Sequence, residues 1–173
     1  FVDFKARVAA LRDELDEAMC RVVDSGWFIL GPEVEAFEQE LRAAFGAAEV
    51  VAVANGTEAL QLGLVAAGVG PGDEVITTPM TDIGTVAAIL ALHAVPVFAD
   101  IDLATRLIDP ASVRARIGPR TKVVIAVHMS GLPCDMKEFA RIAADTGVTI
   151  LEDCAQGHGG RYHGKLLGGL GKA

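Results

Sequence analysis

From Glu49 onward, short apolar runs alternate with helical patterns, and only a narrow group of folds is built in that way. The runs are continuously apolar, which is typical of strands that are buried on both faces of a parallel sheet. The predicted strands are 49–53, 74–77, 95–99, 122–127 and 148–152, and the predicted helices between them are 57–67, 81–92, 110–117 and 135–145. The pattern predicts an α/β fold in which helices cover both faces of a mostly parallel sheet, giving three layers, α/β/α.

The segments on either side of this pattern complete the expected organisation. Apolar side chains at steps of three and four predict an amphipathic helix over 5–23, and a second helix opens at Pro32 and stops at Gly46. Near the other end, a glycine-rich stretch predicts a loop with a short hairpin over 161–167. Because no linker or repeat separates these segments, we predict a single domain over 1–173, and the final residues suggest that it is part of a longer protein.

The charge balance argues against a nucleic-acid partner. The chain has 15 Lys plus Arg against 23 Asp plus Glu, a formal net charge of −8, and its basic residues are scattered singly. Its apolar stretches are broken long before the ~20 residues that a membrane span needs. Three cysteines without disulfide or metal-ligand spacing indicate a reducing compartment. We therefore expect a cytoplasmic protein that binds neither nucleic acid nor a membrane.

The turn after the first predicted strand could hold a phosphate. Asn55, Gly56 and Thr57 stand directly before an apolar helix. Glycine lets the backbone approach a ligand closely, and the helix N-terminus offers unpaired N–H groups and a partial positive charge. The residues alone leave a second interpretation equally open, in which Asn or Thr caps the helix and no ligand is bound.

The turn after the last predicted strand carries two carboxylates, Glu152 and Asp153. A carboxylate at the end of an apolar strand is costly to bury without a positive partner, so Asp153 finds that partner in the protein or in a ligand. A helix cap or a solvated strand end is the alternative. His128 ends another strand and is interpreted as a wall of an active site, and Cys154 as a small packing residue. The four histidines have no recognised ligand spacing, so no metal site is predicted.

Several phrases of the sequence, taken in order, carry a resemblance to a known family. They are 26–34 (GWFILGPEV), 55–60 (NGTEAL), 70–76 (GPGDEVI), 96–102 (PVFADID), 120–122 (RTK), 127–128 (VH) and 152–159 (EDCAQGHG). The ordered set resembles the pyridoxal-phosphate-dependent sugar aminotransferases of the DegT/DnrJ/EryC1/StrS family, which have the type I aminotransferase fold. The resemblance runs from about residue 11 to the end of the chain. It implies that 1–173 is a truncated large domain that lacks the C-terminal small domain.

The resemblance implies a site for pyridoxal 5′-phosphate (PLP). In the family, the Gly-Thr turn holds the cofactor phosphate, and this turn falls on Gly56 and Thr57. The family's aspartate matches Asp153 and pairs with the protonated pyridine nitrogen of the cofactor. Gln156 matches the position that forms a hydrogen bond with the ring hydroxyl.

One departure from the family pattern concerns the ring face. Many members place an aromatic side chain there, where Asp82 stands in this sequence. A carboxylate cannot stack, so either the cofactor pose or the substrate set differs, or Asp82 instead caps the helix over 81–92.

A second departure concerns the Schiff-base lysine. In the family it comes further downstream, in a Ser-Phe-x-x-x-Lys stretch, and the resemblance implies that this stretch lies beyond Ala173. Lys165 and Lys172 stand in the glycine-rich segment, outside such a context, and we assign the role to neither. No catalytic residue is therefore predicted within this chain, and we expect these 173 residues alone to be inactive.

The function that the resemblance implies is transamination. The substrate would be a keto-sugar carried on a nucleotide, with an amino acid, glutamate, as the amino donor and a homodimer as the active form. Two alternatives stay open: a deoxysugar dehydratase of the same family, which has a histidine in place of the lysine and uses pyridoxamine phosphate, and a non-catalytic protein of this fold that binds cofactor or sugar. A dinucleotide-binding domain is disfavoured because the turn after 49–53 lacks the glycine fingerprint.

Overall fold

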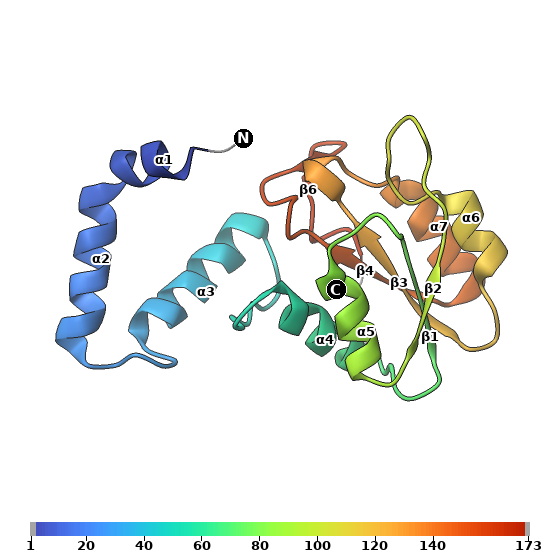
Figure 1. Ribbon diagram of the computed structural model, residues 1–173, viewed down its shortest axis with the longest axis horizontal. Coiled ribbons are helices and arrows are strands. Elements are labelled where there is room, and N and C mark those ends of the chain that lie inside the picture. The colour runs from blue at the N-terminus through green and yellow to red at the C-terminus, as the bar shows by residue number, and fades with distance from the viewer. Residues whose placement is uncertain (1–2, 172–173) are drawn as a thin grey trace. The chain divides into compact units, whose positions relative to one another are not determined.

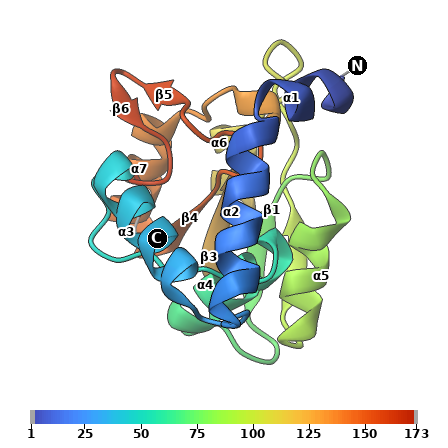
Figure 2. The same ribbon diagram turned by 90° about the vertical axis from the view of Figure 1, so that its left-hand side faces the viewer.

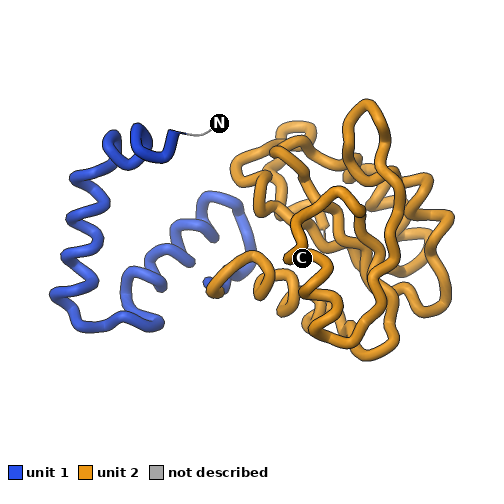
Figure 3. The backbone as a smooth tube through the Cα atoms, in the orientation of Figure 1, with its two compact units in different colours: residues 1–52 blue, residues 53–173 orange. Residues whose placement is uncertain are grey.

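The computed structural model describes residues 3–171 and divides the chain after Ala52 into two compact units (Figure 3). The first unit is helical and the second contains the sheet. The assignment of both units to one domain stays a prediction.

The first unit consists of the helices α1 (Phe4–Ala10), α2 (Arg12–Ser25) and α3 (Pro32–Phe45). The prediction of one continuous helix over 5–23 is wrong, because Leu11 leaves helical geometry (φ −116°, ψ 12°). Its N–H bonds to the carbonyl three residues back, on Val8, which tightens the last turn and ends α1. The predicted second helix is confirmed, with Pro32 at its first position and Gly46 in the left-handed conformation (φ 65°) after its end.

The predicted strand over 49–53 is wrong, since these residues form no strand in the part of the chain that the structure describes. A strand needs a neighbouring strand to pair its backbone groups, and apolar character alone does not supply one. Here the N–H of Ala52 donates instead to the carboxylate of Glu38 at 2.6 Å, and the side chain of Val51 is exposed.

The second unit contains a parallel sheet of four strands, in the order β2-β1-β3-β4. Their bounds are Glu74–Thr77 for β1, Val95–Phe98 for β2, Thr121–Val127 for β3 and Thr149–Asp153 for β4. The remaining four predicted strands are thus confirmed, each to within one residue at either end. The carboxyl ends of β3 and β4 lie side by side, because Val127 pairs with Asp153.

Helices cover both faces of this sheet, as Figure 1 shows. The helices are α4 (Gly56–Ala66), α5 (Ile83–Ala91), α6 (Pro110–Arg116) and α7 (Met136–Thr146). One core cluster joins α4 and α5 to side chains such as Ile125 and Leu151, and a second joins α6 and α7 to Val124 and Ile150. Because neighbouring residues of a strand point to opposite faces, consecutive residues of β3 and β4 belong to different clusters. The predicted three-layer α/β/α fold is confirmed.

Beyond β4 the chain forms a turn and then the predicted hairpin, whose strands are β5 (Arg161–Tyr162) and β6 (Lys165–Leu166) (Figure 2). After the hairpin, Leu167 returns to the body of the unit, where its side chain is fully buried and its N–H donates to the carbonyl of Gly160 at 3.0 Å. The glycine-rich segment that follows therefore lies against the sheet. Across residues 3–171, no helix has both the length and the apolar character needed to cross a bilayer.

Candidate functional site

The N-terminus of α4 offers free backbone donors. Asn55 caps the helix, since its side-chain oxygen accepts the N–H of Glu58 at 3.0 Å. Within residues 3–171, the N–H groups of Gly56 and Thr57 have no hydrogen-bond partner. A helix N-terminus with unpaired N–H groups attracts negative charge. Asn55 thus caps the helix, and the cap leaves the N–H groups of Gly56 and Thr57 available to a ligand, so capping and phosphate binding are compatible at this turn.

The N-terminus of α5 lies beside that of α4. The carboxylate of Asp82 accepts the N–H of Gly84 at 2.7 Å, so the prediction that Asp82 caps this helix is confirmed. A Cβ atom at Gly84 would stand 2.5 Å from the hydroxyl oxygen of Thr57. Glycine at position 84 therefore lets the two helix ends approach this closely with the Thr57 hydroxyl in its present orientation.

Asp153 reaches the same place from the end of β4. Its Oδ1 accepts the N–H of Ala155 at 3.0 Å, and its Oδ2 accepts the hydroxyl of Thr85 at 3.4 Å. The hydroxyl of Thr85 is also 2.8 Å from that of Thr81. Thr85, which is buried, escaped the sequence analysis, although a hydroxyl in the otherwise apolar helix α5 was a usable signal.

These side chains surround one cavity of about 220 Å³. Its lining residues are Gly56, Thr57, Leu60, Asp82, Gly84, Thr85, Asp153 and Ala155. The structure therefore brings together four of the five predicted cofactor-binding residues: Gly56, Thr57, Asp82 and Asp153. An adjoining cavity of about 520 Å³ shares part of this lining, including Gly56 and Asp153. Among the described residues, no lysine or arginine lines either cavity, so the positive potential comes from the helix ends and the negative charge from the acidic side chains.

Gln156, the fifth predicted residue, lines neither cavity. Its side-chain oxygen accepts the N–H of Ser130 at 2.8 Å. Ser130 lies in the 3-10 turn η1 (Met129–Gly131) and has a left-handed backbone conformation (φ 55°). Gln156 thus fastens this turn to the segment after β4, and its role toward a ring hydroxyl stays a prediction.

The two lysines considered for the Schiff base lie apart from these cavities or outside the described residues. Lys165 is in β6 of the hairpin and lines neither cavity. Lys172 and Ala173 fall outside residues 3–171. That the family lysine lies beyond Ala173 therefore stays a prediction, and no residue of the described chain is assigned its role.

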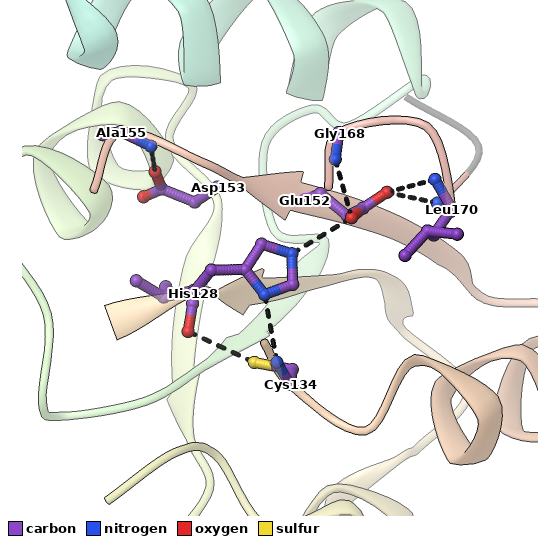
Figure 4. Close-up of polar contacts among 9 residues, drawn as sticks. His128, Cys134, Glu152, Asp153, Ala155, Gly168 and Leu170 are labelled. Atoms are coloured by element: carbon purple, nitrogen blue, oxygen red, sulfur yellow. Dashed lines mark hydrogen bonds and ion pairs between the residues drawn. The ribbon is translucent and has the colours of Figure 1, made fainter. Parts of the chain in front are cut away.

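A second polar group lies on the opposite face of β4, where the side chains of Glu152 and His128 are both fully buried (Figure 4). The Nε2 atom of His128 is 3.0 Å from Oε2 of Glu152, which also accepts the N–H of Gly168 at 3.0 Å. Oε1 of Glu152 accepts the N–H groups of Leu170, at 2.6 Å, and Gly171. The interpretation of His128 as an active-site wall is wrong, because its ring lines neither cavity and points into this buried network.

Electrostatics keep Glu152 ionised. Burial raises the pKa of its carboxyl, but the hydrogen bonds from His128 and from the backbone of Gly168, Gly171 and Leu170 together outweigh burial and hold the pKa below its ordinary value. At the centre of the network is thus a charged carboxylate, and both of its oxygens accept hydrogen bonds.

The same surroundings disable the two nearby thiols. Burial, reinforced by the charge of Glu152, raises the pKa of Cys134 to about 12 and that of Cys154 to about 12. Ligand atoms of His128, Glu152 and Cys154 lie within 4.8 Å of one another, but a metal would need a thiolate and a free ring nitrogen. Both ring nitrogens of His128 are engaged, since Nδ1 accepts the N–H of Cys134 at 3.1 Å. This cluster fits neither a metal ion nor a nucleophilic cysteine.

Relatives with assigned names match along nearly the whole chain. It is 42% identical over 173 residues to the dTDP-3-amino-3,6-dideoxy-alpha-D-galactopyranose transaminase of Aneurinibacillus thermoaerophilus, covering 100% of this chain and 48% of that protein. It is 48% identical over 154 residues to the 3-amino-5-hydroxybenzoate synthase of Amycolatopsis mediterranei, covering 88% of this chain and 40% of that protein. The chain thus spans about half the length of the curated relatives it matches.

Solved structures also match most of this chain. DesV of S. venezuelae, in complex with a ketimine intermediate, superposes with a TM-score of 0.94 at 43% identity, covering 97% of this chain and 45% of that one. NtdA of Bacillus subtilis, with bound cofactor PMP, superposes with a TM-score of 0.82 at 35% identity, covering 84% of this chain and 33% of that one. The fold is therefore that of the PLP-dependent aminotransferases.

The family model for the DegT/DnrJ/EryC1/StrS aminotransferases matches residues 9–173. This range contains both helix ends that border the cavity and the strand that carries Asp153. The chain belongs to the DegT/DnrJ/EryC1/StrS aminotransferase family.

Proposed function

We propose that this protein is a PLP-dependent aminotransferase that transfers an amino group from an amino acid, glutamate, to a keto-sugar carried on a nucleotide. Several relatives that match over most of this chain are named as transaminases of dTDP-linked or UDP-linked sugars. The observation that carries the proposal is the cavity in which two helix N-termini face the carboxylate of Asp153. The homodimer and the large-domain identity of 1–173 rest on the resemblance, the assignment of 1–173 to one domain also on the absence of a linker or repeat, and the cytoplasmic location on the cysteine usage.

The donors and acceptors of this cavity fit PLP. The cofactor carries a phosphate at one end and a protonated ring nitrogen at the other, so it needs anion-binding donors and a carboxylate some distance apart. The unpaired N–H groups of Gly56 and Thr57 supply the first, and Asp153, which has no cationic partner within residues 3–171, supplies the second. The absence of a side chain at Gly84 keeps the hydroxyl of Thr57 accessible.

Each of these residues has a definite task. When bound, PLP supplies an electron sink for reactions at the carbon that bears the amino group. Thr57 and Gly56 bind the phosphate, and Asp153 holds a proton on the ring nitrogen. Thr85 and the N–H of Ala155 orient the Asp153 carboxylate, and the cap at Asp82 keeps the start of α5 in place beside the cavity.

Titration of the chain with pyridoxamine 5′-phosphate tests the cofactor site. Asp153→Asn removes the charge that faces the ring nitrogen while keeping the size of the side chain. A charge-assisted hydrogen bond contributes about 1.5–3 kcal/mol, so we expect the dissociation constant to rise about tenfold to a hundredfold. Asp145→Asn is the matched control, because Asp145 is an exposed aspartate paired with Arg114.

Equal affinities in the Asp153→Asn variant and the unmodified chain would contradict the proposed site. Transfer of the amino group is tested on the whole protein, with glutamate and a nucleotide-linked keto-sugar. Cofactor binding without any turnover would favour the non-catalytic alternative.

A further inference from the structure

We propose that Glu152 and His128 form a positioning pair, which holds the segment 168–171 against the carboxyl end of β4 and thereby fixes the backbone from which Asp153 reaches the cavity. Neither residue lines the 220 Å³ cavity, and His128 does not line the adjoining 520 Å³ cavity either. Glu152 does line the 520 Å³ cavity, but its side chain has no exposed surface, so it borders that cavity with its backbone. The pair therefore acts through the backbone and not on a ligand. The proposal rests on the proposed function only for the task given to Asp153.

Two connections join the pair to Asp153. The backbone N–H of His128 donates to the carbonyl of Asp153 at 3.0 Å, one step beyond the pairing of Val127 with Asp153. The side chain of the same histidine bonds to Glu152, the neighbour of Asp153. His128 therefore holds the end of β4 at two consecutive residues, which fixes the rotation of the strand end about its axis.

The other side of the pair is the segment 168–171, whose sequence is Gly-Gly-Leu-Gly. Glycine loses more conformational entropy on ordering than any other residue, so this segment needs strong fixed contacts to hold one conformation. Three of its four N–H groups donate hydrogen bonds to the carboxylate of Glu152. A Cβ atom at Gly168 would lie 3.5 Å from the sulfur of Cys154, the residue that follows Asp153. The segment thus packs directly against the turn that it stabilises.

The hydrogen bonds also set the tautomer of His128. Because Nδ1 accepts the N–H of Cys134, the ring proton sits on Nε2 and is donated to Glu152. The order of donation therefore runs from Cys134 to His128 and from His128 to Glu152. Asp153 points to the opposite side of the strand, toward the N–H of Ala155 (Figure 4).

Amide hydrogen exchange by NMR on the 173-residue chain tests this arrangement. Glu152→Gln leaves one side-chain oxygen where two served four donors, so we expect the amides of Gly168, Leu170 and Gly171 to exchange about tenfold to a hundredfold faster. The N–H of Ala155, which donates to Asp153, is the reporter for positioning, and we expect its protection to fall as well. A purely local structural role would loosen 168–171 and leave the Ala155 amide unchanged, and that result would overturn the proposal.

A second pair of variants keeps the test decisive if Glu152→Gln does not fold. His128→Gln retains a donor that reaches Glu152, whereas His128→Asn retains only the acceptor for the N–H of Cys134. We expect His128→Asn to lower the protection against exchange of the Ala155 amide and of the amides in 168–171. We expect His128→Gln to preserve most of this protection. Equal behaviour of the two variants would overturn the proposal, and Asp145→Asn again serves as the control for loss of an exposed carboxylate.

Titration with pyridoxamine 5′-phosphate separates this inference from the proposed function. If the unmodified chain does not bind this ligand, the proposed function fails, while the exchange of the Ala155 amide still decides whether the pair positions Asp153. If the chain binds it and Glu152→Gln changes neither the Ala155 amide nor the affinity, the positioning role fails and the proposed function stands.

Discussion

At the scale of single residues, the contact between Gly84 and Thr57 is the tightest constraint on the cavity. Gly84→Ala would place a methyl group 2.5 Å from the Thr57 hydroxyl, so either the Thr57 side chain has to rotate or the start of α5 has to shift. Forcing extra volume into a packed site costs about 1–3 kcal/mol. We expect the free energy of unfolding in urea, followed by circular dichroism, to fall by that amount, and the affinity for pyridoxamine 5′-phosphate to fall with it.

Gly70→Ala is the matched control for this substitution, because a Cβ atom at Gly70 would meet no atom within 4 Å. We expect its free energy of unfolding to stay within about 0.5 kcal/mol of the unmodified value. Equal effects of the two alanine substitutions would show that the approach of the two helix ends is not sterically limited.

Glu152 makes the stability of the chain depend on pH. Its pKa is lower in the folded state than in an exposed chain, so the folded state binds fewer protons than the unfolded state on the acid side. Its contribution is complete above the unfolded pKa and is lost as the pH falls through the folded pKa. We expect the free energy of unfolding to decrease below about pH 5 in urea titrations across the acid range.

Glu152→Gln removes this titrating group, so the decrease below about pH 5 should become shallower, from a lower starting stability. Asp145→Asn, with its exposed side chain, should leave the slope as it is in the unmodified chain. An unchanged acid slope in Glu152→Gln would mean that Glu152 is not the group that couples folding to protons.

At the scale of secondary-structure elements, α5 depends on its cap. Asp82 is the residue whose carboxylate satisfies the N–H of Gly84, and removing an N-cap costs about 1 kcal/mol. Asp82→Ala should therefore lower the free energy of unfolding by about that amount, while Asp82→Asn, which retains an acceptor, should cost only a few tenths. If Asp82→Ala and Asp82→Asn are equally stable in urea titrations, the hydrogen bond from the N–H of Gly84 to the Asp82 side chain does not stabilise α5.

Elements with a local signal were predicted well. Hydrophobic runs, caps and terminal glycines are short-range features, and they placed α3, the four strands of the sheet and the hairpin. The strand over 49–53 failed because pairing depends on a neighbour that the residues themselves do not encode. The resemblance predicted five residues as one site, and the structure brings four of them, Gly56, Thr57, Asp82 and Asp153, to one cavity but not Gln156. The buried network around Glu152 could not be predicted from the sequence. It joins His128 to residues 168–171, and only the fold brings these two parts of the chain together.

At the scale of the whole molecule, the sheet has two strands, β2 and β4, that are paired on one side only within residues 3–171. Val95 and Phe98 of β2 are both 42% exposed. An open strand edge with apolar side chains is a template for pairing with another chain. We expect the 173-residue chain to self-associate, with a mass in sedimentation velocity that rises above 18.0 kDa with concentration.

Val95→Lys places a charge on the β2 edge and should reduce this association, since charged side chains blunt strand edges. Leu103→Lys is the control, because Leu103 is 89% exposed and lies outside every strand of the described chain. A cooperatively melting species of 18.0 kDa at all concentrations would contradict self-association through the open edge of β2.

The two acidic residues that end β4 face opposite layers, Glu152 toward the glycine segment and Asp153 toward the cavity (Figure 4). This makes the strand sensitive to the parity of its length. Inserting or deleting one residue between Thr149 and Leu151 would turn the aspartate into the buried network and the glutamate into the cavity, because side-chain direction repeats every two residues. A two-residue change would keep both on their own sides. Insertions or deletions of two residues in this strand should therefore be tolerated better than those of one residue.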